Sequence, residues 1–162
     1  MCDENKEKVQ RLCKILQRFT LLLGIITFIL PIVFWNRIPD VIPSHYNAAG
    51  IPDQYSDKGI LVFLLFMVAL LMGIMSIAVY YVKQEMTSKY AKEASASQMG
   101  AAYIMLVLMN FSIQCIFAYI TYCSATARSL GRFFLIFTLV LVFVPIVVFV
   151  IYGYQNGKRN SS

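Results

Sequence analysis

ILVFLLFMVALLMGIMSIAVYYV, residues 60–82, contains no Asp, Glu, Lys or Arg in 23 positions. An α-helix rises about 1.5 Å per residue, so about 20 apolar residues cross a hydrocarbon core of about 30 Å. Three more uncharged stretches of 17 to 23 residues occupy positions 19–35, 101–123 and 133–152. We therefore predict an all-α fold, a four-helix transmembrane bundle in a lipid bilayer.

The composition favours the same class of protein. Of the 162 residues, 59% are hydrophobic and 14% are charged, which is too apolar for an ordinary soluble domain. The net charge of +6 has no nucleic-acid-binding motif behind it, so we interpret it as membrane topology and attraction to anionic lipid. We expect no nucleic-acid partner and no cofactor.

The two ends of the chain are polar. Residues 5–18 have helical periodicity, with Lys and Arg mostly on one face and Val9, Leu12, Cys13 and Leu16 on the other. We predict that residues 1–18 form an amphipathic lead-in that rests on the inner leaflet before the first span. Residues 153–162 are predicted to be a frayed tail.

Lys and Arg are distributed unevenly between the two sides. Ten of the fourteen lie in the N-terminal head, in the segment between the second and third spans, or in the tail. The segments on the other side hold Arg37, Lys58, Arg128 and Arg132. Because cytoplasmic loops carry the excess of positive charge, both termini are predicted to be cytoplasmic and residues 36–59 extracytoplasmic.

The segment 36–59 is long for a connection without structure of its own. Pro39, Pro43 and Pro52 each fix φ, and Gly50 offers a position for a positive-φ turn, so few conformations are lost on ordering. We predict an ordered cap on the outer end of the bundle. The apolar residues available to pack there are Ile38, Val41, Ile42, Tyr46, Ile51 and Tyr55.

This segment also holds the single histidine, His45, with Asp53 and Asp57 close in sequence. Three interpretations are open. The groups can hydrogen-bond each other or the backbone and lock the cap; they can bind Zn²⁺ or another divalent cation, for which His45 and Asp53 are the candidate ligands; or they can perform acid–base chemistry, because histidine titrates near neutral pH. No Ser or Cys nucleophile motif accompanies them, which favours a non-enzymatic protein.

Polar and small residues recur at helical spacing inside three of the spans. In the third span a polar face consists of Tyr103, Asn110, Gln114 and Thr121. Stripes of small residues occupy the first span (Thr20, Gly24, Thr27, Pro31) and the second (Ala69, Gly73, Ser76, Tyr80). We expect these faces to point into the bundle, because small and hydrogen-bonding residues mediate helix packing in membranes. A polar substrate path is the alternative.

From Ile38 to Lys58 the order of residues is distinctive: Ile38-Pro39, Ile42-Pro43-Ser44-His45-Tyr46-Asn47, Gly50, Pro52-Asp53 and Lys58. The order resembles the membrane domain of unknown function 1648 (DUF1648), whose pattern is roughly I-P-x-H-[FY]-[ND]-x-x-G-x-P-D followed by a Lys. This domain also opens the SdpI-like immunity proteins, bacterial integral membrane proteins that protect a producer from its own secreted killing peptide. The resemblance covers the first span, the loop and the start of the second span.

The resemblance implies a multi-pass protein of the bacterial plasma membrane. Its outer motif falls on His45, Asn47, Gly50, Pro52, Asp53 and Lys58, to which the residues themselves add Asp57. The predicted function is a non-enzymatic binding or immunity role, in which the loop meets a secreted peptide or an envelope ligand. The alternatives are a membrane-surface metal-binding protein or enzyme centred on His45, and an accessory subunit whose polar third span docks a partner membrane protein.

Overall fold

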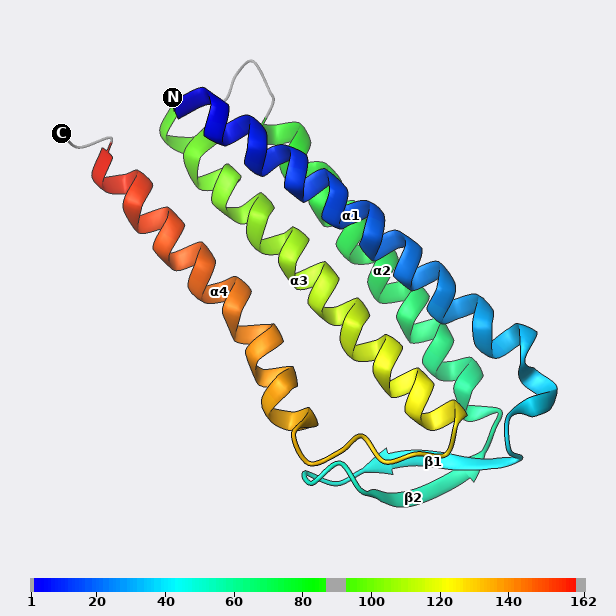
Figure 1. The fold of residues 1–162 in the computed structure, drawn as a ribbon. Coiled ribbons are helices and arrows are strands. Elements are labelled where there is room, and N and C mark those ends of the chain that lie inside the picture. Colours follow the sequence, from blue (N-terminus) through cyan, green and yellow to red (C-terminus); the bar gives the residue numbers. More distant parts are fainter. Residues whose placement is uncertain (1, 87–92, 160–162) are drawn as a thin grey trace.

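The computed structural model describes residues 2–86 and 93–159, with side chains described for 7–86, 99–151 and 153–154. The elements follow the order α1 (Cys2–Val33), a 3-10 turn (Trp35–Arg37), β1 (Val41–Tyr46), β2 (Pro52–Asp57), α2 (Ile60–Met86), α3 (Glu93–Ala125) and α4 (Phe134–Arg159). Both chain ends lie at one end of the helices, and the hairpin β1–β2 lies at the other end (Figure 1).

Four described helices are long and apolar enough to cross a membrane: Glu7–Val33, Ile60–Met86, Met99–Ala125 and Phe134–Ile151. The predicted all-α, four-span fold is confirmed. Exposed large aliphatic and aromatic side chains are numerous on α1, α2 and α4, as a lipid-facing surface requires, whereas among the described residues of α3 they are Tyr119 and Tyr122.

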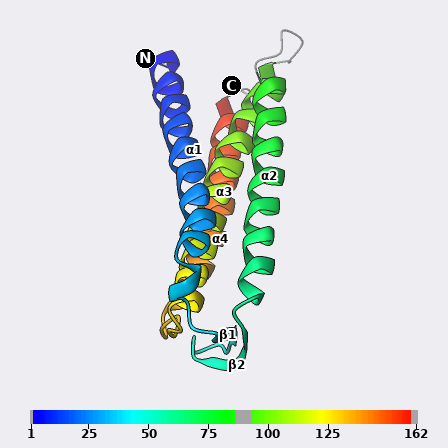
Figure 2. The same cartoon turned by 90° about the vertical axis from the view of Figure 1, so that its right-hand side faces the viewer.

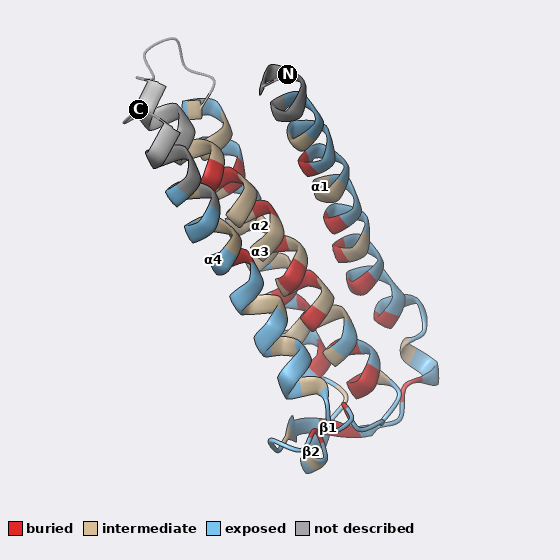
Figure 3. Cartoon of the chain, turned by 60° about the vertical axis from the view of Figure 1, so that its left-hand side comes forward, coloured by how far each residue is buried: buried red, intermediate tan, exposed pale blue. Residues whose placement is uncertain are grey.

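α3 is the centre of the bundle, because it packs against α1, α2 and α4, whereas α1 and α2 meet over a smaller area (Figures 1 and 2). The buried share of each helix agrees with this arrangement. In the apolar stretch of α3 33% of the residues are buried, against 6% in α4. Figure 3 shows α4 mostly in the colour of exposed residues. α4 therefore presents most of its circumference to the membrane.

α1 differs from the predicted lead-in that rests on the inner leaflet before the first span. It is one uninterrupted helix of 32 residues, about 48 Å long at 1.5 Å per residue. Its N-terminal half packs on the bundle through Cys13, which joins Val79 of α2 with Tyr103 and Val107 of α3. The predicted apolar face thus contacts neighbouring helices instead of lying flat on a leaflet, except for Leu12, which is exposed.

The C-terminal tail also differs from its prediction. α4 continues to Arg159, so positions 153–159 are helical, while 160–162 lie outside the described residues. In the segment between the second and third spans, α2 extends to Met86 and α3 begins at Glu93.

The stripe predicted in the first span is confirmed, because Thr20, Gly24, Thr27 and Pro31 are all buried. A Cβ added at Gly24 would run into the sulfur of Met72 in α2 and would lie 3.3 Å from Oε1 of Gln114 in α3. The lack of a side chain at Gly24 allows α1 to approach the Met72 and Gln114 side chains closely.

The stripe predicted in the second span is wrong. Ser76 and Tyr80 are exposed, and a Cβ on Gly73 would meet open space. α2 instead buries its larger aliphatic side chains, namely Leu61, Leu65, Val68 and Val79. Large side chains fill the space between α2 and α3, so small size does not mark the packing face of this helix.

Candidate functional site

The cap predicted over residues 36–59 is a β-hairpin. The prolines of this segment do not predict strands, because proline is uncommon within a sheet. β1 and β2 pair antiparallel, with Val41 opposite Asp57 and Tyr46 opposite Pro52, and the register shifts on either side of His45. The hairpin is anchored by Ile38 and Ile42, which pack with Leu61 at the start of α2. Of the other apolar residues expected to pack the cap, Tyr46 is half-buried, whereas Val41, Ile51 and Tyr55 are exposed.

Asn47 and Gly50 build the turn of the hairpin. The Asn47 side-chain oxygen accepts from the backbone N–H groups of Ala49 (2.9 Å) and Ile51 (3.1 Å), and the Asn47 carbonyl accepts from Gly50 N–H at 2.8 Å. Gly50 has φ of +74°, which a side chain disfavours. The Asn and Gly of the motif therefore have a structural role: they close this turn.

The turn is docked on the connection between α3 and α4. Leu130 N–H donates to the Gly50 carbonyl at 2.8 Å, and a Cβ on Gly50 would lie 2.5 Å from the Gly131 carbonyl oxygen. The Tyr46 hydroxyl lies 3.2 Å from Ser124 Oγ and donates to the Arg128 carbonyl at 3.2 Å. The hairpin is thus held at its base by the start of α2, and near its turn by the end of α3 and the connection to α4.

Beyond the turn, His45 and Asp53 form a cross-strand pair. The His45 Nδ1 and the Asp53 Oδ1 are 2.6 Å apart, and their side chains are 59% and 42% exposed. This is the pairing that the first interpretation of the motif describes. Since Nδ1 is engaged, Nε2 of the imidazole is the nitrogen left for an external group.

At the base of the hairpin, a second ion pair joins Lys58 Nζ to Asp40 Oδ1 at 2.8 Å, and Lys58 also lies over the ring of Trp35. The hydrogen bond and the charge of Lys58 hold the pKa of the Asp40 carboxyl below its usual range. Next to it, Asp57 Oδ1 accepts from Gly59 N–H at 2.7 Å just before α2 begins. Lys58 and Asp57 therefore fix the junction between β2 and α2.

As a metal site the pair is incomplete. Within the described part of the chain there is no group of three or more His, Cys, Asp and Glu side chains that could hold a metal ion. Zn²⁺ in proteins has at least three protein ligands as a rule, and His45 with Asp53 supplies two.

The polar face of the third span lies in the bundle interior, because Tyr103, Asn110, Gln114 and Thr121 are all buried. Among the described residues, Asn110 Oδ1, Thr121 Oγ1 and both polar atoms of Gln114 lack a hydrogen-bond partner. A face buried in this way is inaccessible to another membrane protein, so the structure does not favour docking of a partner through it.

Sequence reasoning missed several residues that hold the hairpin in place. Leu130 and Gly131 contact Gly50 from about 80 positions away, and Asp40 pairs with Lys58. A glycine next to a buried leucine in a short interhelical connection is the only local signal for the first contact. The opposite charges of Asp40 and Lys58 at the two ends of the cap are the signal for the second.

The fold defines a multi-pass membrane protein with four apolar helices and a docked hairpin between the first two. Residues 22–72 match the sequence model of the family described as Domain of unknown function (DUF1648). The chain therefore carries a DUF1648 domain, as its residues predict; it comprises the C-terminal part of α1, the hairpin and the first half of α2. No characterised protein and no solved structure matches the chain.

Proposed function

We propose that this protein is a non-enzymatic binding protein of immunity type, whose hairpin receives an extended segment of a secreted peptide. The observation that carries the proposal is the outer edge of β2. Among the described residues β2 pairs with β1 alone, and five of its six residues are exposed. A strand with a free edge can bind another extended chain through backbone hydrogen bonds.

The ladder identifies which backbone groups face outward. Lys58 N–H donates to the Asp40 carbonyl at 2.8 Å, and bonded and non-bonded pairs alternate along an antiparallel ladder. The pair Pro43–Tyr55 is then a non-bonded pair, which suits Pro43 because it has no N–H to donate. Tyr55 accordingly offers its N–H and its carbonyl to an incoming strand.

The side chains of β2 favour a cationic peptide. Asp53 and Asp57 lie on this strand, and the ring of Tyr55 is exposed between them. Carboxylates attract Lys and Arg, and an exposed aromatic ring adds a cation–π contact. The free edge supplies affinity, and these side chains supply selectivity for charge.

The role requires the hairpin to lie outside a bacterial plasma membrane, with both termini in the cytoplasm. The distribution of Lys and Arg supports this orientation, since ten of the fourteen fall on the side of the termini. Cysteine labelling of intact cells at position 45 tests it. Labelling by a membrane-impermeant reagent is expected, and protection until the cells are lysed would contradict the orientation.

The functional test begins with the neighbouring genes, among which we expect one for a secreted peptide. Sensitive cells that express the chain are then challenged with that peptide. Tyr55→Pro should abolish protection, because proline removes the outward N–H while remaining compatible with an edge position. Tyr55→Val, which keeps the N–H and removes the ring, is the matched control and should lose only part of it.

Equal protection by wild type and Tyr55→Pro, at equal protein level, would contradict binding at the β2 edge. His45→Ala and Asp53→Ala test the motif separately. If both leave survival and protein level unchanged, the pair has no part in the interaction.

The 2.6 Å contact between His45 and Asp53 favours one alternative, proton transfer at the membrane surface by an imidazole that a carboxylate orients. It predicts a catalytic activity of the purified protein that His45→Ala removes. Bound metal that disappears in the same variant would instead favour the metal-binding alternative.

A further inference from the structure

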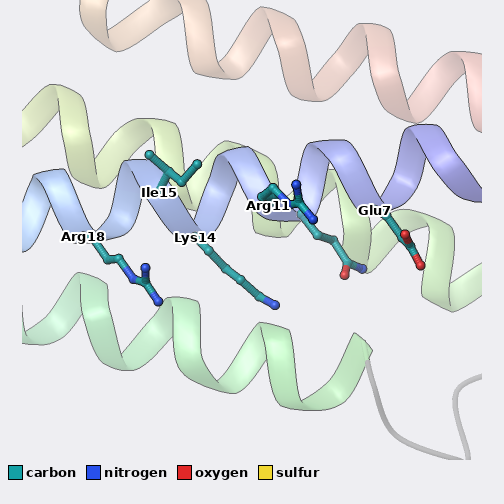
Figure 4. A pocket seen from close by; sticks show the side chains of 6 residues that line it. Glu7, Arg11, Lys14, Ile15 and Arg18 are labelled. Atoms are coloured by element: carbon teal, nitrogen blue, oxygen red, sulfur yellow. The ribbon is translucent and has the colours of Figure 1, made fainter.

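One face of α1 carries a row of charged side chains near its N-terminal end. Glu7, Arg11, Lys14 and Arg18 follow one another at spacings of four, three and four residues, so they lie on the same side of the helix. With Gln10 and Ile15 they line a shallow recess of about 420 Å³. Figure 4 shows Glu7, Lys14 and Arg18 projecting from the same side of α1.

The charges in this recess are unbalanced, with three cations against one carboxylate. Arg11 and Lys14, and Lys14 and Arg18, are like-charged neighbours of the kind that destabilises a helix. Within the described part of the chain, no ion pair to Arg11, Lys14 or Arg18 is formed. An anion placed between them would relieve the repulsion.

A count of residues along α1 puts the recess at the level of a lipid headgroup. A hydrocarbon core of about 30 Å, measured along α1 from Val33 at the hairpin end, reaches about as far as Lys14. Arg18 would then lie a few residues inside the core. Because helical side chains lean toward the N-terminus, its guanidinium can extend back toward the level of Lys14.

On the C-terminal side of Arg18 the same face of α1 becomes apolar. Leu22, Ile25, Ile29 and Ile32 continue the spacing from Arg18, and their side chains are between 41% and 53% exposed. A single face thus presents cations at the headgroup level and then an apolar track along the hydrocarbon. This order matches the order of groups in a phospholipid.

We propose that the recess binds the phosphate headgroup of an anionic phospholipid, whose acyl chain lies along Leu22, Ile25 and Ile29. The inference is independent of the role proposed for the hairpin, which lies at the other end of the helices (Figure 1). The apolar track distinguishes a lipid from free phosphate, because free phosphate has no group to place there.

The test measures binding of phosphatidylglycerol and of phosphatidylcholine with identical acyl chains to the purified full chain in neutral detergent, by native mass spectrometry. Lys14→Gln/Arg18→Gln should weaken phosphatidylglycerol binding about 30-fold, roughly fivefold for each cation lost near an anionic headgroup. The matched control is Arg37→Gln/Arg132→Gln, which removes two exposed cations at the hairpin end. It should change binding less than twofold.

A gain-of-binding variant guards against loss of fold. Glu7→Gln removes the one carboxylate of the recess and should strengthen phosphatidylglycerol binding about fivefold. Equal affinity for the two lipids, or equal loss in the test and control variants, would overturn the site. Displacement of phosphatidylglycerol by inorganic phosphate at millimolar concentration would overturn the assignment to a lipid.

Discussion

Substitution of Gly50 by alanine tests whether the hairpin is docked as described. Gly50 has φ of +74°, and a side chain in the left-handed region costs about 1 to 2 kcal/mol. The new Cβ would also lie 2.5 Å from the Gly131 carbonyl oxygen, which forces the turn away from residues 130–131. That displacement breaks the hydrogen bond from Leu130 N–H to the Gly50 carbonyl, for about 1 kcal/mol more.

Together these effects lower the free energy of hairpin docking by about 2 to 3 kcal/mol. The assay is hydrogen exchange at the Leu130 amide in detergent micelles, since this amide is protected only while the turn is docked. Exchange should accelerate by about 30-fold to 140-fold in Gly50→Ala, at about tenfold per 1.4 kcal/mol.

Substitutions at two other glycines separate the backbone cost from the effect of the close contact with Gly131. Gly131 has φ of +81° but open space around its Cβ position, so Gly131→Ala carries the backbone cost alone, about 1 to 2 kcal/mol. Gly73 lies within α2 with open space, so Gly73→Ala should leave exchange at Leu130 unchanged. Equal acceleration in Gly50→Ala and Gly131→Ala would refute the close approach of the turn to Gly131.

Three further perturbations probe the rest of the structure. Tyr46→Phe removes the hydroxyl that contacts Ser124 and should weaken docking by about 1 kcal/mol in the same exchange assay; unchanged exchange would show that the hydroxyl does not hold the hairpin. The ion pair with Lys58 holds the pKa of the Asp40 carboxyl below its ordinary value, so the stabilisation by this pair is present above the ordinary pKa and is lost as the pH falls through the lowered pKa. Asp40→Asn should remove this part of the acid sensitivity, and an unaltered pH profile of exchange would contradict it. Gln114→Leu should stabilise the bundle by about 1 kcal/mol in reversible unfolding in mixed micelles, because it removes two buried polar atoms that lack partners, whereas destabilisation would mean that the amide is paired.

The sequence by itself predicted the number of spans, because uncharged runs of bilayer length have no other stable environment. It also predicted the inward face of the third span, since Asn110 and Gln114 are costly in lipid and their spacing places them on one side of a helix. In the first span, Gly24 and the small residues around it marked the packing face correctly.

The second span shows where such reasoning fails. Nearly every residue of α2 is apolar, so polarity does not distinguish the face that packs from the face that meets lipid. Small size was then the only remaining signal, and it selected Gly73, which has open space beside it. Which face of α2 is buried depends on how its side chains fit against α3, and the sequence of α2 alone does not specify that fit.

The candidate site divides in the same way. The prolines and Gly50 predicted that residues 36–59 are ordered, because proline fixes φ and glycine permits a positive-φ turn. The docking of the hairpin on Leu130 and Gly131 depends on contacts between distant parts of the chain. The choice among the three interpretations of His45 and Asp53 depends on the register of the two strands, which brings these side chains together. Local sequence determines which backbone angles are accessible, whereas only tertiary packing decides which strand, loop or charge a residue meets.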